Sequence, residues 1–281
     1  MKLYPLRLPD KMKRWKNAIR ALRAIAANPW LLNKVLEDDD KGWLEWVERR
    51  LGHSSGLPLL DLGTLFPGFE VTLEPIAFLD GGSPPMDIGL LVSLAKSIRD
   101  CSYFEIGSWR GESVTNVARV AKEAYTLNLS KEEIILRGWG ADHAAIQGYF
   151  SKDLPNVHHL YGDSRTFDYA GLGKKFDLVF IDGSHHFDYV KNDTAKVFEH
   201  LLHDKSIVVW HDYAYAPEQI RPEVLAGILE GVPRNLHRYL YYVSNTMCAV
   251  FIREDFPTST LKYPSEPNKH FRVKVELVHR E

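Results

Sequence analysis

Apolar positions in residues 11–51 recur at spacings of three and four, the period of an amphipathic helix. The pattern occurs twice, on either side of the acidic break "EDDDKG", and predicts two helices. The tryptophans among these positions are at helical spacing, so we expect them to pack and not to form a recognition surface. The apolar positions are Met12, Trp15, Ile19, Leu22 and Ala26, then Trp43, Trp46, Val47 and Leu51.

After residue 86 the period changes. Short apolar runs such as "SYFEIG" and "KFDLVFID" alternate with amphipathic runs such as "DIGLLVSLAKSIRD". Strands that alternate with helices are typical of a parallel sheet covered on both faces. Near the end, two apolar runs flank Ser244 and Asn245, which indicates an antiparallel hairpin. The predicted fold class is α/β: a doubly wound, mostly parallel sheet with an antiparallel C-terminal hairpin and an N-terminal helical extension.

Gly- and Pro-rich stretches and changes in the apolar pattern divide the chain into three predicted parts. Residues 1–85 are a helical lead followed by a loop, rich in Gly and Pro from residue 54 on, that wraps a neighbouring domain. Residues 86–255 hold the sheet and its helices. Residues 256–281 are a tail in which apolar and charged residues alternate over 271–279, the pattern of a half-exposed edge strand.

Composition narrows the class of protein. A net charge of −2 and a pI near 6.6 give no overall attraction to nucleic acid. Basic residues gather only in residues 1–34, and we interpret them as a solvated helix face in preference to a membrane-surface or anionic-partner patch. These are Lys2, Arg7, Lys11, Lys13, Arg14, Lys16, Arg20, Arg23 and Lys34, against the single acid Asp10.

Cysteine usage and the length of the apolar runs indicate the cellular compartment. The two cysteines, Cys101 and Cys248, lie beside apolar runs and are interpreted as core residues of a protein in a reducing compartment. No apolar run approaches the roughly 18 residues that span a bilayer. We therefore expect a cytoplasmic protein without a transmembrane segment.

Every strand predicted for the sheet ends in polar residues. Because ligands of open α/β sheets lie beyond the carboxyl ends of the strands, these residues are candidates for one site. The first strand is followed by a tight glycine turn that matches neither a dinucleotide fingerprint nor a phosphate-binding loop. In strand order the candidates are Glu105 with Gly107, Ser108 and Gly111; Asn128; Asp163 with Ser164; Asp182 with His185; and His211 with Asp212.

Taken in order, five runs resemble a class I S-adenosylmethionine-dependent methyltransferase of the group whose fourth strand ends in Asp-Gly-x-His. They are "YFEIGSWRGESVTNVA", "YTLNLS", "NVHHLYGDSRTFD", "KFDLVFIDGSHHFDYVKND" and "SIVVWHDY", and they cover roughly residues 86–253. The resemblance implies a Rossmann-like fold and S-adenosylmethionine as cofactor. It implies that Glu105, Gly107, Ser108 and Gly111 hold the methionine end, Asn128 the ribose, and Asp163 and Ser164 the adenine, with Asp182 near the reactive methyl group.

One position departs from that family. The family usually places an acid where Asn128 stands. An amide can still hydrogen-bond a ribose hydroxyl, but that bond lacks the added strength that a charged carboxylate gives.

The resemblance leaves two chemistries open. Related O-methyltransferases bind a divalent ion at positions that match Asp182, His211 and Asp212, which implies Mg or Mn here; the histidine suits Mn, Fe or Zn better than Mg. The metal-free alternative uses His185 as general base beside Asp182. We interpret His186 as solvent-facing, and Asp188 and Asp193 as the solvated first turns of the next helix.

The function predicted is S-adenosylmethionine-dependent O-methylation of a small hydroxylated metabolite. The alternatives are a related hydroxylase-like enzyme or oxidoreductase, the latter disfavoured by the missing dinucleotide fingerprint, and a noncatalytic S-adenosylmethionine-binding module. The acceptor would be contacted by the lead, the loop and an insertion that carries Trp139 and His143. Oligomeric state is open, with a homo-oligomer as one option.

Overall fold

The structure is a computed structural model that describes residues 10–29, 31, 40–52 and 55–279. The basic residues Lys2, Arg7 and Lys34 lie outside the described residues. In the part that is described, no helix is long and apolar enough to cross a membrane.

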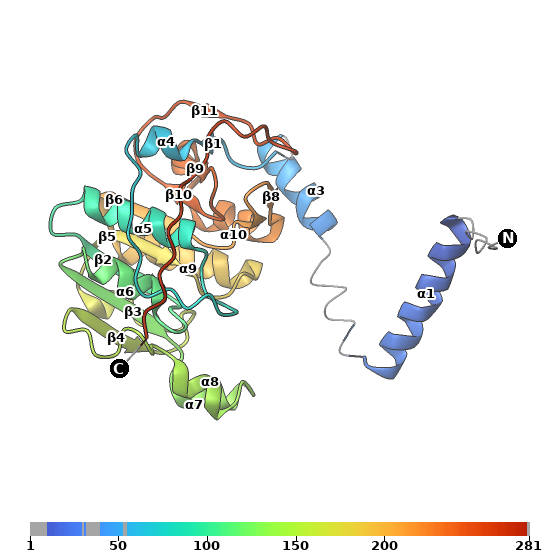
Figure 1. The fold of residues 1–281 in the computed structure, drawn as a ribbon, viewed down its shortest axis with the longest axis horizontal. Helices are drawn as coiled ribbons and strands as arrows, with labels where there is room; N and C mark the ends of the chain where they lie inside the picture. The colour runs from blue at the N-terminus through green and yellow to red at the C-terminus, as the bar shows by residue number, and fades with distance from the viewer. Residues whose placement is uncertain (1–9, 30, 32–39, 53–54, 280–281) are drawn as a thin grey trace.

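Five parallel strands form one side of a nine-stranded sheet, from one of its edges inward (Figure 1). The strand that comes first in the chain lies in the middle of the five. Two later strands lie on one side of it and two on the other, so the strand order reverses beside it. This is the doubly wound, Rossmann-like arrangement that the sequence predicts. In sheet order the five are β4 (Val157–Tyr161), β3 (Glu123–Asn128), β2 (Ser102–Ile106), β5 (Phe176–Ile181) and β6 (Leu202–Trp210).

The sheet continues beyond β6 with four shorter strands. The predicted C-terminal hairpin is confirmed, because its two strands pair antiparallel and the second pairs antiparallel with β6. A separate two-stranded sheet lies outside. The strands are β10 (Ala249–Phe251), β9 (Leu240–Val243), β1 (Leu59–Leu60) and β11 (Thr258–Ser259), with β7 (Ala214–Ala216) and β8 (Gln219–Ile220) in the small sheet.

Helices cover both faces of the sheet, which is what an apolar parallel sheet requires. One core lies under α9 and α10 and contains Val190, Val197 and Ile228; the other lies under α5 and α6 and contains Leu91 and Val114. The described helices of this part are α4 (Leu62–Leu65), α5 (Pro85–Ser97), α6 (Glu112–Ala118), α7 (Lys131–Leu136), α8 (Ala141–Ile146), η1 (Ala170–Leu172), α9 (Phe187–His200), α10 (Pro222–Gly231) and η2 (Arg234–Tyr239).

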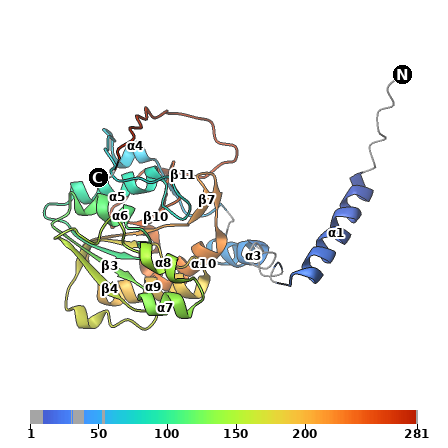
Figure 2. The ribbon, with the colours of Figure 1, turned by 60° about the horizontal axis from the view of Figure 1, so that its bottom comes forward.

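The two helices of the lead differ in what they contact. In α3 (Asp40–Leu51), Val47 is fully buried and the ring of Trp43 stacks on Phe187 with centroids 4.9 Å apart. In α1 (Asp10–Ala27), Trp15 is 72% exposed, and Figures 1 and 2 show the helix well away from the body. The expectation that the lead tryptophans pack is therefore confirmed for α3 and wrong for Trp15.

The loop that precedes α5 is hydrogen-bonded to helix α6. The Glu112 carboxylate accepts a hydrogen bond from the Ala77 amide at 2.5 Å, and the Asn116 amide oxygen accepts one from the Glu74 amide at 2.7 Å. Both acceptors belong to α6, so the loop is tied to the helix that starts at the carboxyl end of β2. The loop thereby reaches the edge formed by the carboxyl ends of the parallel strands, which we call the rim of the sheet.

The predicted edge strand over residues 271–279 is wrong, because these residues form no strand. The tail pairs instead through β11, which is antiparallel to β1 at the far edge of the sheet. Beyond it, Phe271 packs edge-on against Phe69 of the wrapping loop, and Val273 stays 77% exposed. Alternation makes a segment suitable for a strand, but only an open neighbouring strand makes it one.

Candidate active site at the carboxyl end of the sheet

Three ionisable side chains meet where β5 and β6 end. The Asp182 amide donates to the Ile106 carbonyl, and the His211 amide donates to the Ile181 carbonyl, so hydrogen bonds tie the ends of β2, β5 and β6 together. The next residue, Asp212, has a left-handed φ of 55°, unusual without glycine. Asp182, His211 and Asp212 offer ligand atoms that all lie within 4.8 Å of one another, the arrangement of a possible metal site.

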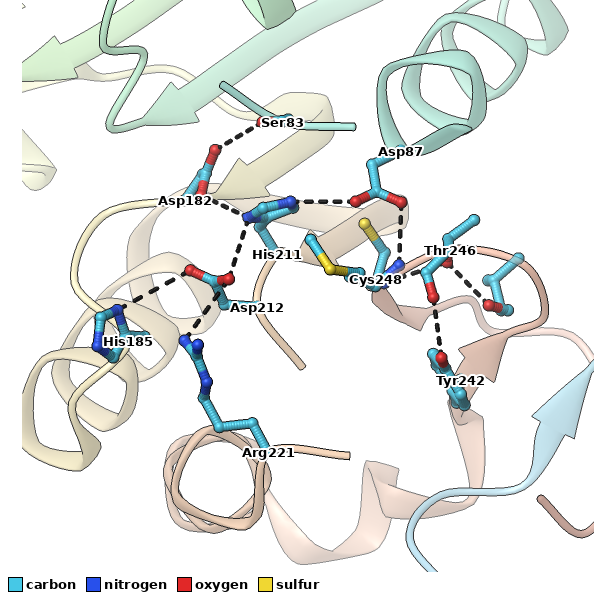
Figure 3. Close-up of polar contacts among 12 residues, drawn as sticks. Ser83, Asp87, Asp182, His185, His211, Asp212, Arg221, Tyr242, Thr246 and Cys248 are labelled. Atoms are coloured by element: carbon cyan, nitrogen blue, oxygen red, sulfur yellow. Dashed lines mark hydrogen bonds and ion pairs between the residues drawn. The ribbon is translucent and has the colours of Figure 1, made fainter. Parts of the chain in front are cut away.

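The imidazole of His211 lies at the centre of this cluster (Figure 3). Its Nε2 is 3.1 Å from Asp87 Oδ2 and forms a hydrogen bond. Its Nδ1 is 3.0 Å from Asp182 Oδ1 and 3.7 Å from Asp212 Oδ1, yet has no aligned hydrogen-bond partner although it is buried. With Asp87 accepting the proton of Nε2, a neutral imidazole would turn the lone pair of Nδ1 toward the two carboxylates, whereas a charged imidazole places a second proton there.

Asp87, which holds this imidazole, is a site residue that sequence analysis missed. It lies in the first turn of α5, is fully buried, and also accepts a hydrogen bond from the Met247 amide at 2.9 Å. A buried carboxylate needs such partners. The available signal was a single acid at the start of the otherwise apolar run "MDIGLLVSLA".

The cluster is strongly coupled electrostatically. Burial opposes charge on His211, but the carboxylates of Asp182, Asp212 and Asp87 outweigh it and hold the pKa of His211 well above its usual range. Burial raises the pKa of Asp182 despite its contact with His211. Asp212 is half-buried, and the hydrogen bond and charge of His211, with the charge of Arg221, outweigh that burial and lower its pKa. A positive charge on His211 among these three carboxylates is therefore favourable.

Two further residues border the cluster. Ser83, from the wrapping loop, donates a hydrogen bond to Asp182 Oδ2 at 3.1 Å. His185 Nδ1 lies 3.9 Å from Asp212 Oδ2, and nearly half of the side chain is exposed. Partial burial and the charge of Arg221 lower the pKa of His185, so its imidazole is neutral near pH 7.

A cavity of about 10 Å³ lies between these groups, room for about one water-sized species. Its lining includes Asp182, His185, His211 and Asp212. The larger hollow of about 460 Å³ lies between α3 and α9, at Trp46 and Phe187, and contains no rim residue. We place the chemistry at the small cavity because the ionisable groups converge there.

Both predicted glycines of the turn after β2 have left-handed backbones. A Cβ on Gly107, at φ 83°, would lie 2.2 Å from the Asp182 carbonyl oxygen. A Cβ on Gly111, at φ 85°, would lie 2.5 Å from Ser151 Oγ. These glycines are required because other parts of the protein approach the turn closely, a reason that differs from the ligand approach expected from the sequence.

Asn128 ties this turn to β3. Its Oδ1 accepts a hydrogen bond from the Ser108 amide at 2.8 Å, and its Nδ2 donates to Ser108 Oγ and Thr126 Oγ1, each at 2.9 Å. Both hydrogens of the amide are thus used within the protein. The expected contact of Asn128 with a ribose stays a prediction, and only its oxygen retains capacity for one.

Glu105 lies beneath the turn and not on its surface. It is fully buried and accepts hydrogen bonds from the Tyr103 hydroxyl and, at 2.8 Å, from Ser113 Oγ. Burial raises the pKa of Glu105 to about 8. At neutral pH the side chain is largely protonated, so it supplies little negative charge to a cofactor.

Asp163 is neutralised within the protein. Its carboxylate lies 2.6 Å from Arg137 Nη2 and 3.4 Å from Arg165 Nη2, and hydrogen bonds from the two arginines outweigh burial and lower its pKa. The neighbouring Ser164 donates a hydrogen bond to Asp193 Oδ2 at 3.1 Å.

Asp193 corrects the interpretation of the helix after β5. Asp188 is exposed in the first turn of α9, as expected, but Asp193 is only 1% exposed. Val190 and Val197 occupy the packed face of α9, and helical spacing places Asp193 on that face too. Burial raises the pKa of Asp193 to about 6.

The insertion between β3 and β4 packs on the glycine turn. The Gly148 amide donates to the Trp109 carbonyl at 2.7 Å, and the rings of Trp109 and His143 lie 3.7 Å apart. Trp139 contacts His143 edge-on and is 56% exposed. The predicted contact of Trp139 and His143 with an acceptor stays a prediction.

Comparison with known proteins identifies the central segment. Residues 104–213, from β2 to just after β6, match the family model described as a methyltransferase domain. No curated protein sequence matches the chain. The match identifies the activity as methyl transfer from S-adenosylmethionine.

Solved structures are similar only at a distance. The SAH-bound Podospora anserina methyltransferase PaMTH1 is 18% identical with a TM-score of 0.45, over 61% of this chain and 80% of that one. CalS11, a TDP-rhamnose 3'-O-methyltransferase of calicheamicin biosynthesis, is 12% identical with a TM-score of 0.42, over 60% and 78%. CalS10, an amino pentose methyltransferase from Micromonospora echinaspora, is 20% identical with a TM-score of 0.35, over 53% and 62%.

Proposed function

We propose that this S-adenosylmethionine-dependent methyltransferase methylates a hydroxyl group of a small molecule, and that Asp182, His211 and Asp212 hold a divalent cation beside the reacting atoms. The observation that carries the proposal is the buried Nδ1 of His211, which has no aligned hydrogen bond and lies 3.0 Å and 3.7 Å from the carboxylates of Asp182 and Asp212. A cation held by these three groups would take the place of the proton that the carboxylates otherwise favour on Nδ1. Two oxygens and one imidazole nitrogen are a donor set that first-row divalent metals accept.

Among divalent metals the donor set favours manganese over magnesium. Magnesium prefers an all-oxygen environment, whereas an imidazole nitrogen suits manganese, iron or zinc better. Asp87 supports the assignment, since metal-binding histidines almost always donate their other N–H to a carboxylate or carbonyl. Such a cation would polarise the acceptor hydroxyl and lower its pKa.

His185 is suited to take the proton of the acceptor. Its imidazole lies at the cavity and is neutral near pH 7. In the step proposed, the acceptor oxygen attacks the methyl carbon, the carbon–sulfur bond breaks with its electron pair on sulfur, and the hydroxyl proton passes to His185. Positive charge on the sulfonium disappears in this step, so Asp182 stabilises the bound cofactor more than the product.

The cofactor would extend along the rim from this point. We propose that Gly107, Ser108 and Gly111 hold its methionine end through the backbone of the turn, with Glu105 beneath them in a supporting position. Asn128 would meet the ribose through its oxygen, and Asp163 and Ser164 would border the adenine. The order of these residues along β2, β3 and β4 supports the assignment.

The proposed division of the chain, at residues 85 and 255, cuts through the site. Ser83 lies before the first boundary and bonds directly to Asp182. We therefore propose that the wrapping loop is part of the catalytic unit and not a separable lead.

Calorimetry and methyl-transfer assays test the proposal together. We expect the purified protein to bind S-adenosylmethionine, and its transfer to a panel of hydroxylated acceptors to fall after chelation and return with Mn²⁺. In His185→Gln we expect roughly 100-fold slower transfer and loss of the acidic limb of the pH–rate profile. Transfer that is indifferent to chelators would refute the metal, and cofactor binding without transfer to any acceptor would indicate a noncatalytic module.

A further inference from the structure

Helix α1 presents large apolar side chains to solvent. Trp15 is 72% exposed, Ile19 49% and Leu22 67%. Together they make one stripe, because residues four and three apart lie on the same face of a helix. An apolar stripe that stays exposed among the described residues is typical of an interaction surface.

Cations border this stripe on both sides. At about 100° per residue, Lys16, Arg20 and Arg23 lie along one side of Trp15, Ile19 and Leu22, and Arg14 lies along the other. All four are exposed. No acid occurs in α1 after Asp10, so Lys16, Arg20 and Arg23 have no acidic neighbour within the helix.

Charge is divided sharply between this helix and the remainder of the chain. Six lysines and arginines and one aspartate give α1 a formal charge of +5. Because the whole chain carries −2, the rest of it carries −7. An anionic surface therefore attracts α1 and repels the body.

We propose that α1 is a docking helix for the surface of an anionic phospholipid bilayer. The Trp15, Ile19 and Leu22 side chains would enter the boundary between headgroups and acyl chains, and the flanking lysine and arginine side chains would reach the phosphates. The helix is too polar to span the bilayer, so it lies in the plane of the interface. This inference does not depend on the proposed reaction or metal.

The rival partner is a second copy of the chain. The α7–α8 hairpin exposes Leu136 (87%) and Trp139 (56%), and these could face the stripe of α1. The arrangement of charge favours the bilayer, because Arg14 lies on one side of the stripe and Lys16, Arg20 and Arg23 lie on the other, and a plane of anionic headgroups meets both sides at once. A lipid surface covers the whole stripe.

Vesicle co-sedimentation of the full chain tests the proposal. We expect binding to vesicles of phosphatidylcholine mixed with phosphatidylserine, at least tenfold weaker binding to phosphatidylcholine alone, and loss of binding at high salt. Arg20→Glu with Arg23→Glu should weaken binding to the anionic vesicles at least tenfold. Trp15→Ser should weaken binding while the salt dependence persists.

A matched charge change on the body provides the control. Lys96→Glu with Arg99→Glu alters two exposed cations at the end of α5 by the same charge and should leave vesicle binding unchanged. Equal binding of wild type and the α1 variant would overturn the proposal. Absence of vesicle binding would also overturn it. If sedimentation velocity then showed a dimer that Trp15→Ser dissociates, the stripe would bind a second copy of the chain instead.

Discussion

The two halves of the rim contain similar residues in different states. At the ends of β5 and β6, Asp182, His211 and Asp212 crowd within 4.8 Å and leave a buried imidazole nitrogen without a hydrogen bond. At the ends of β3 and β4, Asn128 bonds to Ser108 and Thr126, and Asp163 is held by two arginines. Polar residues at strand ends therefore do not suffice to mark a site. The two halves differ in their hydrogen bonds: the polar atoms at the ends of β3 and β4 have protein partners, whereas His211 Nδ1 at the end of β6 has no aligned one.

The largest effect is expected at the unsatisfied half. Asp182→Asn removes one of the two carboxylates that face Nδ1 of His211, so less negative charge remains to hold a cation or a proton there. We expect methyl transfer to fall roughly 1000-fold and Mn²⁺ affinity, followed by electron paramagnetic resonance, to fall with it. Asp188→Asn, on the exposed first turn of α9, is the matched control and should change neither. Full activity of the Asp182 variant would remove the cluster from the mechanism.

A smaller effect is expected at Asp87, which contacts His211 but is not one of the three proposed cation ligands. Asp87 accepts from both His211 Nε2 and the Met247 amide, so an amide in its place must point an N–H at one of these donors. Asp87→Asn would release Nε2–H and favour the tautomer that blocks Nδ1. We expect roughly tenfold weaker Mn²⁺ binding with little change in S-adenosylmethionine affinity measured by calorimetry. If both affinities fell equally, Asp87 would act through folding instead of through the imidazole.

The satisfied half should tolerate the same kind of change. Asp163→Asn keeps the shape of the side chain and weakens two partly exposed ion pairs, which are worth little in solvent. We expect S-adenosylmethionine affinity to weaken roughly threefold and the rate of transfer at saturating cofactor to be retained. A loss as large as that for Asp182→Asn would show that the two halves are not different in kind.

The smallest effect concerns Glu105, between the halves. Its folded pKa is raised from 4.5 to about 8, so the folded state binds the proton more tightly than the unfolded state. The stabilising contribution is complete below pH 4.5 and is lost as the pH rises through 8. Glutamine cannot ionise, so the melting temperature of Glu105→Gln should fall less between pH 5 and pH 9 than that of the wild type. Parallel melting curves in scanning calorimetry would contradict the buried, protonated state.

Local patterns predicted much of the architecture. The alternation of apolar runs and amphipathic segments predicted the parallel sheet, and the split run around Ser244 predicted the hairpin, because each pattern matches the period of the element it forms. The strand ends also identified Asp182, His211 and Asp212 as neighbours, since parallel strands deliver their last residues to one edge.

Other features required knowledge of what packs beside each segment. Trp15 and Trp43 have the same spacing pattern, yet only Trp43 meets a partner. Asp188 and Asp193 are both acids on α9, yet only Asp193 lies on the buried face. Asp87 is distant in sequence from the His211 that it orients. The alternating tail has the period of a strand but no open strand beside it.

By itself, then, the amino-acid sequence determined the periods of the elements, their order, and which strand ends carry ionisable groups, because these depend on spacing within short segments. Tertiary structure alone decided which polar atoms are left without partners, which apolar faces are covered, and that Asp87 locks the imidazole of His211. These properties depend on atoms brought together from distant parts of the chain. For this reason the strand ends alone could nominate Asp182, His211 and Asp212 as neighbours, while the buried nitrogen of His211 without an aligned hydrogen bond appeared only in the folded protein.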